Sequence, residues 1–228
     1  MQLQLITTED GSHSIYMKDL NEVYHSRFGA VNESMHVFIE AGFMQPLSTS
    51  KVLSGLRVNI LEIGFGTGLN AFLTLKQCLE TNVQVDYVTL EPYPIKKEIW
   101  QQLNYPKIIN LPEGDKIFKE LHNCEWGKTI EINPRFSFLK HLSGIEEVGL
   151  KDDFFNLVYF DAFAPEIAPG LWVLPIFEKI FKAMKRGGVF VTYSAKGVVR
   201  RALQSAGFDV ERIPGPKGKR EMLRAVKR

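Results

Sequence analysis

The sequence has few cysteines and no long hydrophobic run. Its two cysteines, Cys78 and Cys124, lie far apart in a chain of 228 residues and belong to no metal-ligand or redox pattern. No apolar run approaches the ~20 residues that a membrane-spanning helix needs. Residues 1–10 lack the basic and apolar regions of a signal peptide. We therefore expect a cytoplasmic protein without a disulfide framework, a membrane anchor or a bound metal.

Several patterns of catalytic chemistry are also missing. The sequence contains no Gly-x-x-x-x-Gly-Lys-[Ser/Thr] phosphate-binding loop and no Ser-His-Asp arrangement that we can locate. Its histidines are scattered, and we expect each of them to be structural: His13, His25, His36, His122 and His141. A hydrophobic content of 45% and a charged content of 24% are ordinary for a soluble globular domain with a substantial core.

The charge is distributed unevenly along the chain. The net charge is only +2, but residues 179–228 hold 14 of the 28 Lys and Arg and three of the 26 Asp and Glu. Such asymmetry is typical of a protein with a face that binds a polyanion. A solvated basic surface without a partner would give the same composition, so this feature alone leaves both interpretations open.

A glycine-rich turn at residues 62–70 is the most informative stretch. It reads Glu-Ile-Gly-Phe-Gly-Thr-Gly-Leu-Asn, it follows an apolar run at residues 58–61, and it precedes a predicted helix at residues 69–79. A strand, a glycine turn and a helix in this order are typical of a nucleotide-binding α/β unit. The dinucleotide fingerprint would place its third glycine at Leu69, but here it is Gly68. The spacing instead resembles motif I of the S-adenosylmethionine-dependent methyltransferases.

The rest of the chain predicts an α/β fold with additions at both ends. We expect a Rossmann-like, mostly parallel sheet covered on both faces, because strands alternate with helices. Residues 1–54 are predicted to form an N-terminal extension, and residues 55–228 the methyltransferase domain. The extension is expected to contain a hairpin turning at Asp10-Gly11, a helix at residues 30–41 and a loop at residues 46–54.

The predicted elements of the main domain follow from periodicity and turn signals. The strands are expected at residues 58–63, 85–90, 129–132, 157–160 and 189–193. The helices are expected at residues 69–79, 95–103, 136–142, 171–184 and 198–206. An antiparallel C-terminal hairpin is expected at residues 209–213 and 221–226, on either side of a turn rich in proline and glycine.

Acidic residues close two of these strands. Ligands of such sheets bind at the carboxyl ends of the strands, so residues at those positions are candidates for the site. Glu91 ends the strand at residues 85–90, where a carboxylate can accept the hydroxyl protons of a ribose. Glu62 would be costly to bury without a partner. We expect it to accept hydrogen bonds near the amino-acid end of the cofactor or from the backbone of the glycine turn.

Asp161 follows the strand at residues 157–160, where a cofactor methyl group and an acceptor amine would meet. An attacking amine gains positive charge, which a nearby carboxylate stabilises. Because an ordinary Asp has a pKa of about 3.9, we expect orientation and charge stabilisation from Asp161 rather than proton abstraction. Phe163 offers a face for a stacked base, whereas Trp172 is expected to belong to the core.

Over nearly the whole chain, the sequence is similar to the methyltransferase domain of the MnmC family of bifunctional tRNA-modifying proteins. The blocks that carry this resemblance lie, in order, at residues 10–16, 23–26, 32–39, 62–70, 161–172, 198–208 and 219–223. The resemblance implies methyl transfer from S-adenosylmethionine to the aminomethyl group of 5-aminomethyl-2-thiouridine at the tRNA wobble position. The FAD-dependent oxidoreductase domain of the bifunctional proteins has no counterpart here. We therefore expect a stand-alone form, with another protein supplying the aminomethyl precursor.

The resemblance also implies roles for individual residues. The cofactor would be bound by Glu33, Ser34, Glu62, Gly64, Phe65, Gly66, Thr67, Gly68, Asn70 and Glu91. Asp161 would be the catalytic residue. Phosphates and the flipped base of the tRNA anticodon arm would be contacted by Phe163, Arg200, Arg201, Lys217, Lys219 and Arg220.

The sequence departs from the family at two positions. The family commonly has Gly-Asp after its third strand, where the Asp meets the adenine amino group, whereas residues 133–135 here read Asn-Pro-Arg. Adenine recognition is therefore assigned to Asn133 or to backbone groups. In the family, the loop after Asp161 usually carries a lysine near the position of Ile167. That lysine is absent here, which weakens the expectation that the substrate contacts are the same.

Two other functions are compatible with these patterns. The methyltransferase could act on another amine, in a small molecule or a protein, although the basic C-terminal region disfavours a small molecule. Alternatively, the protein could bind cofactor and tRNA without catalysis. Asp161 together with Phe163 disfavours this second alternative.

Overall fold

A single eight-stranded sheet organises the computed structural model, which describes residues 2–45 and 56–228. The strand order is β10-β11-β9-β8-β4-β5-β7-β6. Five neighbouring strands are parallel: β4 (Arg57–Ile63), β5 (Gln84–Leu90), β7 (Phe136–His141), β8 (Phe155–Phe160) and β9 (Met184–Thr192). This arrangement confirms the predicted Rossmann-like α/β fold.

Antiparallel strands extend the sheet on both sides. β11 (Glu221–Val226) pairs with β9 and with β10 (Asp209–Pro214), so the predicted C-terminal hairpin is confirmed and joins the sheet through its second strand. On the other side, β6 (Ile130–Asn133) pairs antiparallel with β7 and forms the edge.

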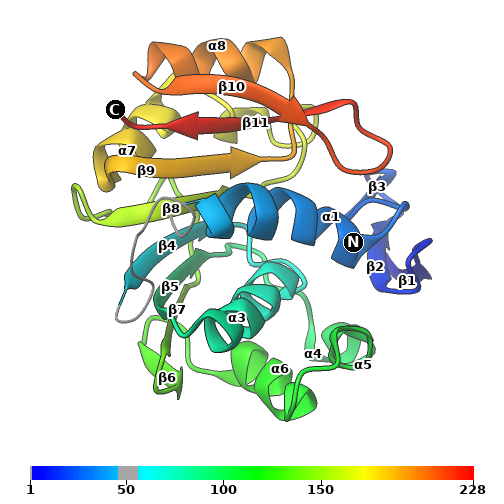
Figure 1. Ribbon diagram of the computed structural model, residues 1–228. Coiled ribbons are helices and arrows are strands. Elements are labelled where there is room, and N and C mark those ends of the chain that lie inside the picture. The colour runs from blue at the N-terminus through cyan, green and yellow to red at the C-terminus, as the bar shows by residue number, and fades with distance from the viewer. Residues whose placement is uncertain (1, 46–55) are drawn as a thin grey trace.

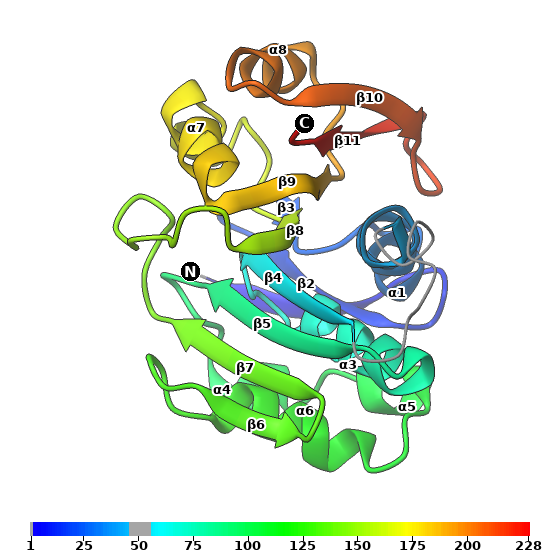
Figure 2. The same cartoon turned by 60° about the vertical axis from the view of Figure 1, so that its left-hand side comes forward.

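Helices cover both faces of the sheet (Figure 1). One face packs against α3 (Leu69–Thr81), α6 (Gly114–Asn123), the short helices α4 (Lys97–Trp100) and α5 (Tyr105–Ile109), and the N-terminal helix. The other packs against α7 (Leu174–Ala183) and α8 (Gly197–Ser205). Figure 2 shows α7 and α1 on opposite sides of the sheet.

Side chains alternate between two hydrophobic cores along the central strands. Ile60 and Tyr159 point into one core, and their neighbours Leu61 and Val158 point into the other. All four are fully buried. Each large apolar side chain buried in this way contributes about 1.5–3 kcal/mol relative to its exposed state.

The N-terminal extension consists of a small sheet and one helix. The sheet has the order β1-β2-β3, with β1 (Leu3–Thr7), β2 (His13–Met17) and β3 (Glu22–Val23). The helix begins as α1 (Ala30–Ser34) and continues as the π-helix η1 (Met35–Phe43). It lies so close to the main sheet that a Cβ atom on Gly42 would be 3.0 Å from Val191. The predicted loop at residues 46–54 and the predicted domain boundary after it lie outside the described residues.

The strand beside β5 lies at residues 136–141 and not at the predicted residues 129–132. Residues 136–142, predicted to be helical, form β7, and the predicted strand at residues 129–132 is the antiparallel edge strand β6. Lys140 hides the strand pattern because it occupies a fully buried position in line with Phe136 and Phe138. Its Nζ donates a hydrogen bond to the His122 carbonyl at 2.7 Å and lies 4.4 Å from the centre of the Trp126 ring.

Candidate active site

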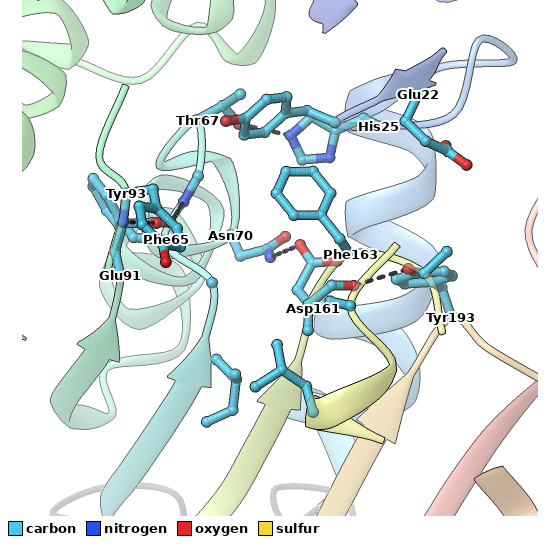
Figure 3. A pocket seen from close by; sticks show the side chains of 18 of the residues that line it. Glu22, His25, Phe65, Thr67, Asn70, Glu91, Tyr93, Asp161, Phe163 and Tyr193 are labelled. Atoms are coloured by element: carbon cyan, nitrogen blue, oxygen red, sulfur yellow. Dashed lines mark hydrogen bonds between the residues drawn. The ribbon is translucent and has the colours of Figure 1, made fainter. Parts of the chain in front are cut away.

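A cavity of about 790 Å³ opens at the carboxyl ends of the parallel strands (Figure 3). All five parallel strands contribute lining residues at or just beyond their ends: Ile63, Leu90, Gly144, Asp161 and Tyr193. Residues 22–28 of the N-terminal extension form a further wall. The volume is in the range of sites that hold a small molecule or cofactor.

The glycine turn has the backbone geometry that its sequence predicts. Gly64, Gly66 and Gly68 have φ angles of 94°, 49° and 75°, a region that other residues rarely adopt. A Cβ atom on Gly64 would lie 2.7 Å from the Asp161 carbonyl oxygen, and one on Gly68 would lie 2.9 Å from Nε2 of His122. Gly64 and Gly66 line the cavity, whereas Gly68 lies behind it at the start of α3. The predicted direct cofactor contact of Gly68 is therefore replaced by a role in shaping the turn.

Two histidines hold Thr67 in this turn. Nε2 of His25 lies 2.6 Å from the Thr67 hydroxyl, and Nε2–H of His122 donates to the Thr67 carbonyl at 3.2 Å. Burial lowers the pKa of His25 to about 4 and that of His122 to about 3. Both imidazoles are therefore neutral near pH 7, as expected for histidines that stabilise a loop.

The carboxylate of Glu91 links the turn to the next strand. Its two oxygens accept hydrogen bonds from the backbone N–H groups of Gly66 and Tyr93, at 2.9 and 2.8 Å. Burial raises its pKa, while the two backbone donors act in the opposite direction. A carboxylate has about four lone-pair sites, so acceptor capacity remains at the cavity wall for hydroxyl groups.

Asp161 lies across the cavity from Glu91 (Figure 3). Its Oδ2 accepts a hydrogen bond from Nδ2 of Asn70 at 2.8 Å. Burial raises the pKa of Asp161 to about 7 and the Glu33 carboxylate adds to this effect, whereas Asn70 and Lys219 oppose it. The ordinary pKa assumed from the sequence therefore does not apply, and a carboxyl group with a pKa near 7 can accept a proton at neutral pH.

The backbone around Asp161 is held by aromatic side chains. The Tyr193 hydroxyl donates to the Ala162 carbonyl, and Nε1 of Trp172 donates to the Phe163 carbonyl, both at 2.8 Å. The Phe163 ring lines the cavity and meets the Tyr24 ring edge-on, with 5.2 Å between the centroids. Trp172 is only 3% exposed, which confirms its predicted place in the core.

Ten of the residues predicted for the site line the cavity: Glu33, Gly64, Phe65, Gly66, Thr67, Asn70, Glu91, Asp161, Phe163 and Lys219. Ser34 does not line it, because its side chain is fully buried beneath the surface of the N-terminal helix. The arginines Arg200, Arg201 and Arg220 lie outside it as well, and their contacts to phosphates stay a prediction.

The predicted role of Glu62 needs correction. Its carboxylate is fully buried outside the cavity, where the side chains of Thr89, Asn70 and Tyr87 face it instead of the backbone of the glycine turn. The predicted bonds to the glycine turn are therefore absent. Burial raises its pKa to about 8, with Thr89 opposing and Asp161 adding to the shift.

Asn133 lies away from the cavity, so its predicted contact with adenine is wrong. Because Phe136 pairs with Val85, the turn before β7 lies at the amino end of β5, opposite the cavity. The carboxyl end of β7 is followed instead by residues 144–147, which line the cavity. Those residues, rather than Asn133, occupy the position where an adenine would be recognised.

The basic C-terminal turn is already partly neutralised. Lys217 forms an ion pair with Glu9 at 2.7 Å, and Lys219 forms one with Glu33 at 2.7 Å. Both partners belong to the N-terminal extension, so these pairs fasten the C-terminal hairpin to the wall of the cavity. Arg200 and Arg201, on the first half of α8, follow the carboxyl end of β9 and therefore lie on the side of the sheet where the cavity opens.

Several lining residues were not singled out as site residues from the sequence: Glu22, Tyr24, His25, Tyr93, Ile145 and Tyr193. Tyr24 and His25 belong to the block at residues 23–26, which is one of those that carry the family resemblance. That resemblance is the sequence signal that could have identified them as site residues. Tyr193 directly follows β9, and Tyr93 lies three residues after the end of β5. Ile145 could have been found only if residues 136–141 had been recognised as a strand.

The cavity suits S-adenosylmethionine in its chemistry. Gly66 exposes bare backbone, Glu91 retains acceptor capacity, and Oδ1 of Asn70 is buried without a hydrogen-bond partner among the described residues. The bare backbone at Gly66 would let the cofactor approach closely. Glu91 would accept hydrogen bonds from its hydroxyl groups, and Asn70 would accept one from its ammonium group.

Within residues 2–45 and 56–228, no group of three or more His, Cys, Asp or Glu side chains could hold a metal ion. In the same ranges, no helix is long and apolar enough to cross a membrane.

Comparisons with known sequences agree with this chemistry. Residues 125–228 match a family described as S-adenosyl-L-methionine-dependent methyltransferase. The tRNA 5-methylaminomethyl-2-thiouridine biosynthesis bifunctional protein MnmC of Nitrosospira multiformis is 29% identical over 92% of this chain and 34% of its own length. The MnmC of a Marinomonas species is 31% identical over 94% of this chain and 32% of its own length. The chain thus spans about a third of the length of the curated relatives it matches.

Two solved structures show the same fold. The crystal structure of MnmC2 from Aquifex aeolicus superposes with a TM-score of 0.77 at 26% identity, covering all of this chain and 70% of that one. A probable spermidine synthase from Corynebacterium glutamicum has a TM-score of 0.54 at 15% identity, covering 99% of this chain and 77% of that one. The second likeness concerns the fold alone.

Proposed function

We propose, from the premise that this chain is an MnmC-like S-adenosyl-L-methionine-dependent methyltransferase, that it methylates 5-aminomethyl-2-thiouridine at the tRNA wobble position. The acceptor atom is the nitrogen of the aminomethyl group, and the product is the 5-methylaminomethyl derivative. The observation that carries this proposal is one continuous cavity with Glu91 on one side, Asp161 and Phe163 on the other, and the glycine turn between them.

The residues of the chain divide the work between binding and proton transfer. The glycine turn, Asn70 and Glu91 would hold the cofactor; when bound, S-adenosylmethionine supplies an electrophilic methyl group. Asp161 would take the proton that the acceptor ammonium must lose before its nitrogen can attack, because its pKa of about 7 suits proton transfer at neutral pH. Asn70 orients this carboxylate through its hydrogen bond. Phe163 would stack on the uracil ring.

The basic C-terminal region would bind the anticodon arm. Arg200 and Arg201 on α8, with Arg220 in the hairpin turn, would contact phosphates and position the arm, while the flipped wobble base enters the cavity. Lys219 would contribute less to phosphate binding because it is held by Glu33. A tRNA substrate would place the protein in the cytoplasm, and the aminomethyl precursor would come from another enzymatic activity.

A transfer assay tests this function directly. The protein is incubated with methyl-labelled S-adenosylmethionine and either tRNA carrying the aminomethyl group or the same tRNA fully modified, and the nucleosides are separated after digestion. We expect label only in the wobble nucleoside of the aminomethyl tRNA. Label on small amines or proteins instead would favour another acceptor. Cofactor and tRNA binding without any label would favour a non-catalytic protein.

A further inference from the structure

The acceptor end of the cavity is strongly acidic. Among the described residues, three carboxylates line it, from Glu22, Glu33 and Asp161, together with the half-buried cation Lys219 and the exposed Arg27 of the N-terminal wall. Two contacts place Tyr193 beside two of them: its hydroxyl donates to the carbonyl of Ala162, next to Asp161, and its ring lies 4.1 Å from the Lys219 ammonium that Glu33 holds. An acceptor that enters beside Tyr193 therefore meets the carboxyl groups of Asp161 and Glu33.

The one lysine at this end is occupied. Nζ of Lys219 donates to Oε1 of Glu33 at 2.7 Å and lies 4.1 Å from the centre of the Tyr193 ring. The other oxygen of Glu33 accepts a hydrogen bond from the Ser26 backbone N–H at 2.7 Å. Only 9% of the Glu33 side chain is exposed. The N-terminal extension thus fixes the Glu33 carboxylate in a position where it holds the ammonium group of Lys219.

We propose that Glu33 determines substrate specificity: by engaging Lys219, it prevents the cavity from binding acceptor amines that carry a carboxylate of their own. The site is thereby restricted to amines without an anionic substituent. This inference rests on the proposed function and names the class of acceptor that the same site rejects.

The physical reason is the balance of charge around Asp161. With Glu33 in place, a carboxylate on the acceptor would meet like charges from Glu22, Glu33 and Asp161, in a cavity where charges are screened less than in water. Without the Glu33 carboxylate, Lys219 would become an unpaired cation next to the acceptor amine. That cation would suit the carboxylate of an N-carboxymethyl amine.

Two variants and one double variant isolate this effect. In Glu33→Gln, the amide oxygen can still accept from Ser26, while the carboxylate that held Lys219 is gone. Glu33→Ala also frees the Lys219 ammonium group, but it leaves no side-chain amide beside it. This variant serves as a second test if Glu33→Gln folds poorly. In Glu33→Gln/Lys219→Gln, the freed cation is removed as well.

The measurement is the affinity for three forms of one tRNA, with the wobble uridine unmodified, aminomethylated, or bearing the N-carboxymethyl derivative of the aminomethyl group. For the wild type, we expect the carboxymethyl form to bind no better than the unmodified one. Glu33→Gln and Glu33→Ala should bind the carboxymethyl form about tenfold more tightly, the size of effect that one close charge pair produces. The double variant should lose this gain.

Three outcomes would overturn the proposal: no gain in either single variant, a gain that persists in the double variant, or tight binding of the carboxymethyl form by the wild type. Methylation of the aminomethyl tRNA by the wild type is measured in parallel. Absence of methylation would refute the proposed function, whereas normal methylation with unchanged selectivity would refute only the role of Glu33.

Discussion

Asn70 donates a hydrogen bond to Asp161 over 2.8 Å, joining the first turn of α3 to the residue that follows β8. The two residues are 91 positions apart and meet because β4 and β8 are parallel neighbours. The helix that begins at the glycine turn therefore sets the orientation of the Asp161 carboxyl group. In the proposed function, this contact would couple cofactor binding to proton transfer.

The first prediction concerns Asp161 itself. Asp161→Asn should lower kcat by about 10²–10⁴-fold, the usual contribution of a general base, because an amide cannot accept the proton. Cofactor affinity, measured by calorimetry, should change little. Asp152→Asn, at an exposed ion pair with Lys182, is the matched control and should leave both quantities unchanged. Unaltered turnover in Asp161→Asn would show that the acceptor binds elsewhere.

The second prediction concerns the pH dependence of the reaction. Asp161 must be ionised to accept a proton, so kcat/KM of the wild type should rise with pH through its pKa of about 7. The hydrogen bond from Asn70 lowers that pKa, and its removal in Asn70→Ala should therefore move the rise to higher pH. The check is a pH profile of kcat/KM for both proteins. A shift towards lower pH would contradict the assignment.

The third prediction concerns the stability of the cofactor-free protein. The pKa of Glu62 is raised from its ordinary value of 4.5 to about 8, so the folded state holds a proton that the unfolded state releases between these values. The stabilisation that comes from this bound proton is complete below pH 4.5 and is lost as the pH rises through 8. In Glu62→Gln, the fall in the free energy of unfolding between pH 5 and pH 8 should be smaller by at least about 1 kcal/mol. Urea titrations at both pH values would measure it, and an equal fall in both proteins would refute it.

The fourth prediction separates backbone strain from steric conflict. Gly64 and Gly187 both have positive φ angles, but a Cβ atom would meet the Asp161 carbonyl at 2.7 Å only at Gly64, and nothing within 4 Å at Gly187. Gly187→Ala should cost about 1–2 kcal/mol from the left-handed conformation alone. Gly64→Ala should cost more than that, because the turn and the end of β8 must separate. Equal losses in urea unfolding would show that the turn adapts freely.

The fifth prediction concerns the tRNA interface. Arg200→Gln and Arg201→Gln should each weaken tRNA binding and reduce the slope of log affinity against log salt by about 0.7–0.9, the value for one lost phosphate contact. Arg135→Gln is the control, because Arg135 lies at the opposite edge of the sheet next to the β6–β7 turn. Filter-binding titrations at several salt concentrations would measure the slopes. Equal slopes for all three variants would place the interface elsewhere.

Much of the site was predictable because its signals are local. The glycine spacing, the apolar run before it and the helix after it are contiguous, and they predicted the turn that lines the cavity. Glu91 and Asp161 were recognisable because each directly ends or follows a strand, and parallel strands bring such residues to one edge. The secondary structure of residues 129–142 could not be predicted from such local signals. Lys140 is buried by a carbonyl and an aromatic ring that come from other segments of the chain.

The amino-acid sequence by itself determined the α/β alternation, the glycine turn and the resemblance to the MnmC methyltransferase domain, because these depend on residues close together in the chain. Only the tertiary structure decided which strand is third, that Glu62 is sealed away from the cavity, and that Glu33 holds Lys219 across 186 positions. It also decided the pKa of Asp161, because that value depends on burial and on charges brought from both ends of the chain. Contacts of this kind follow from packing, which no local pattern of residues specifies.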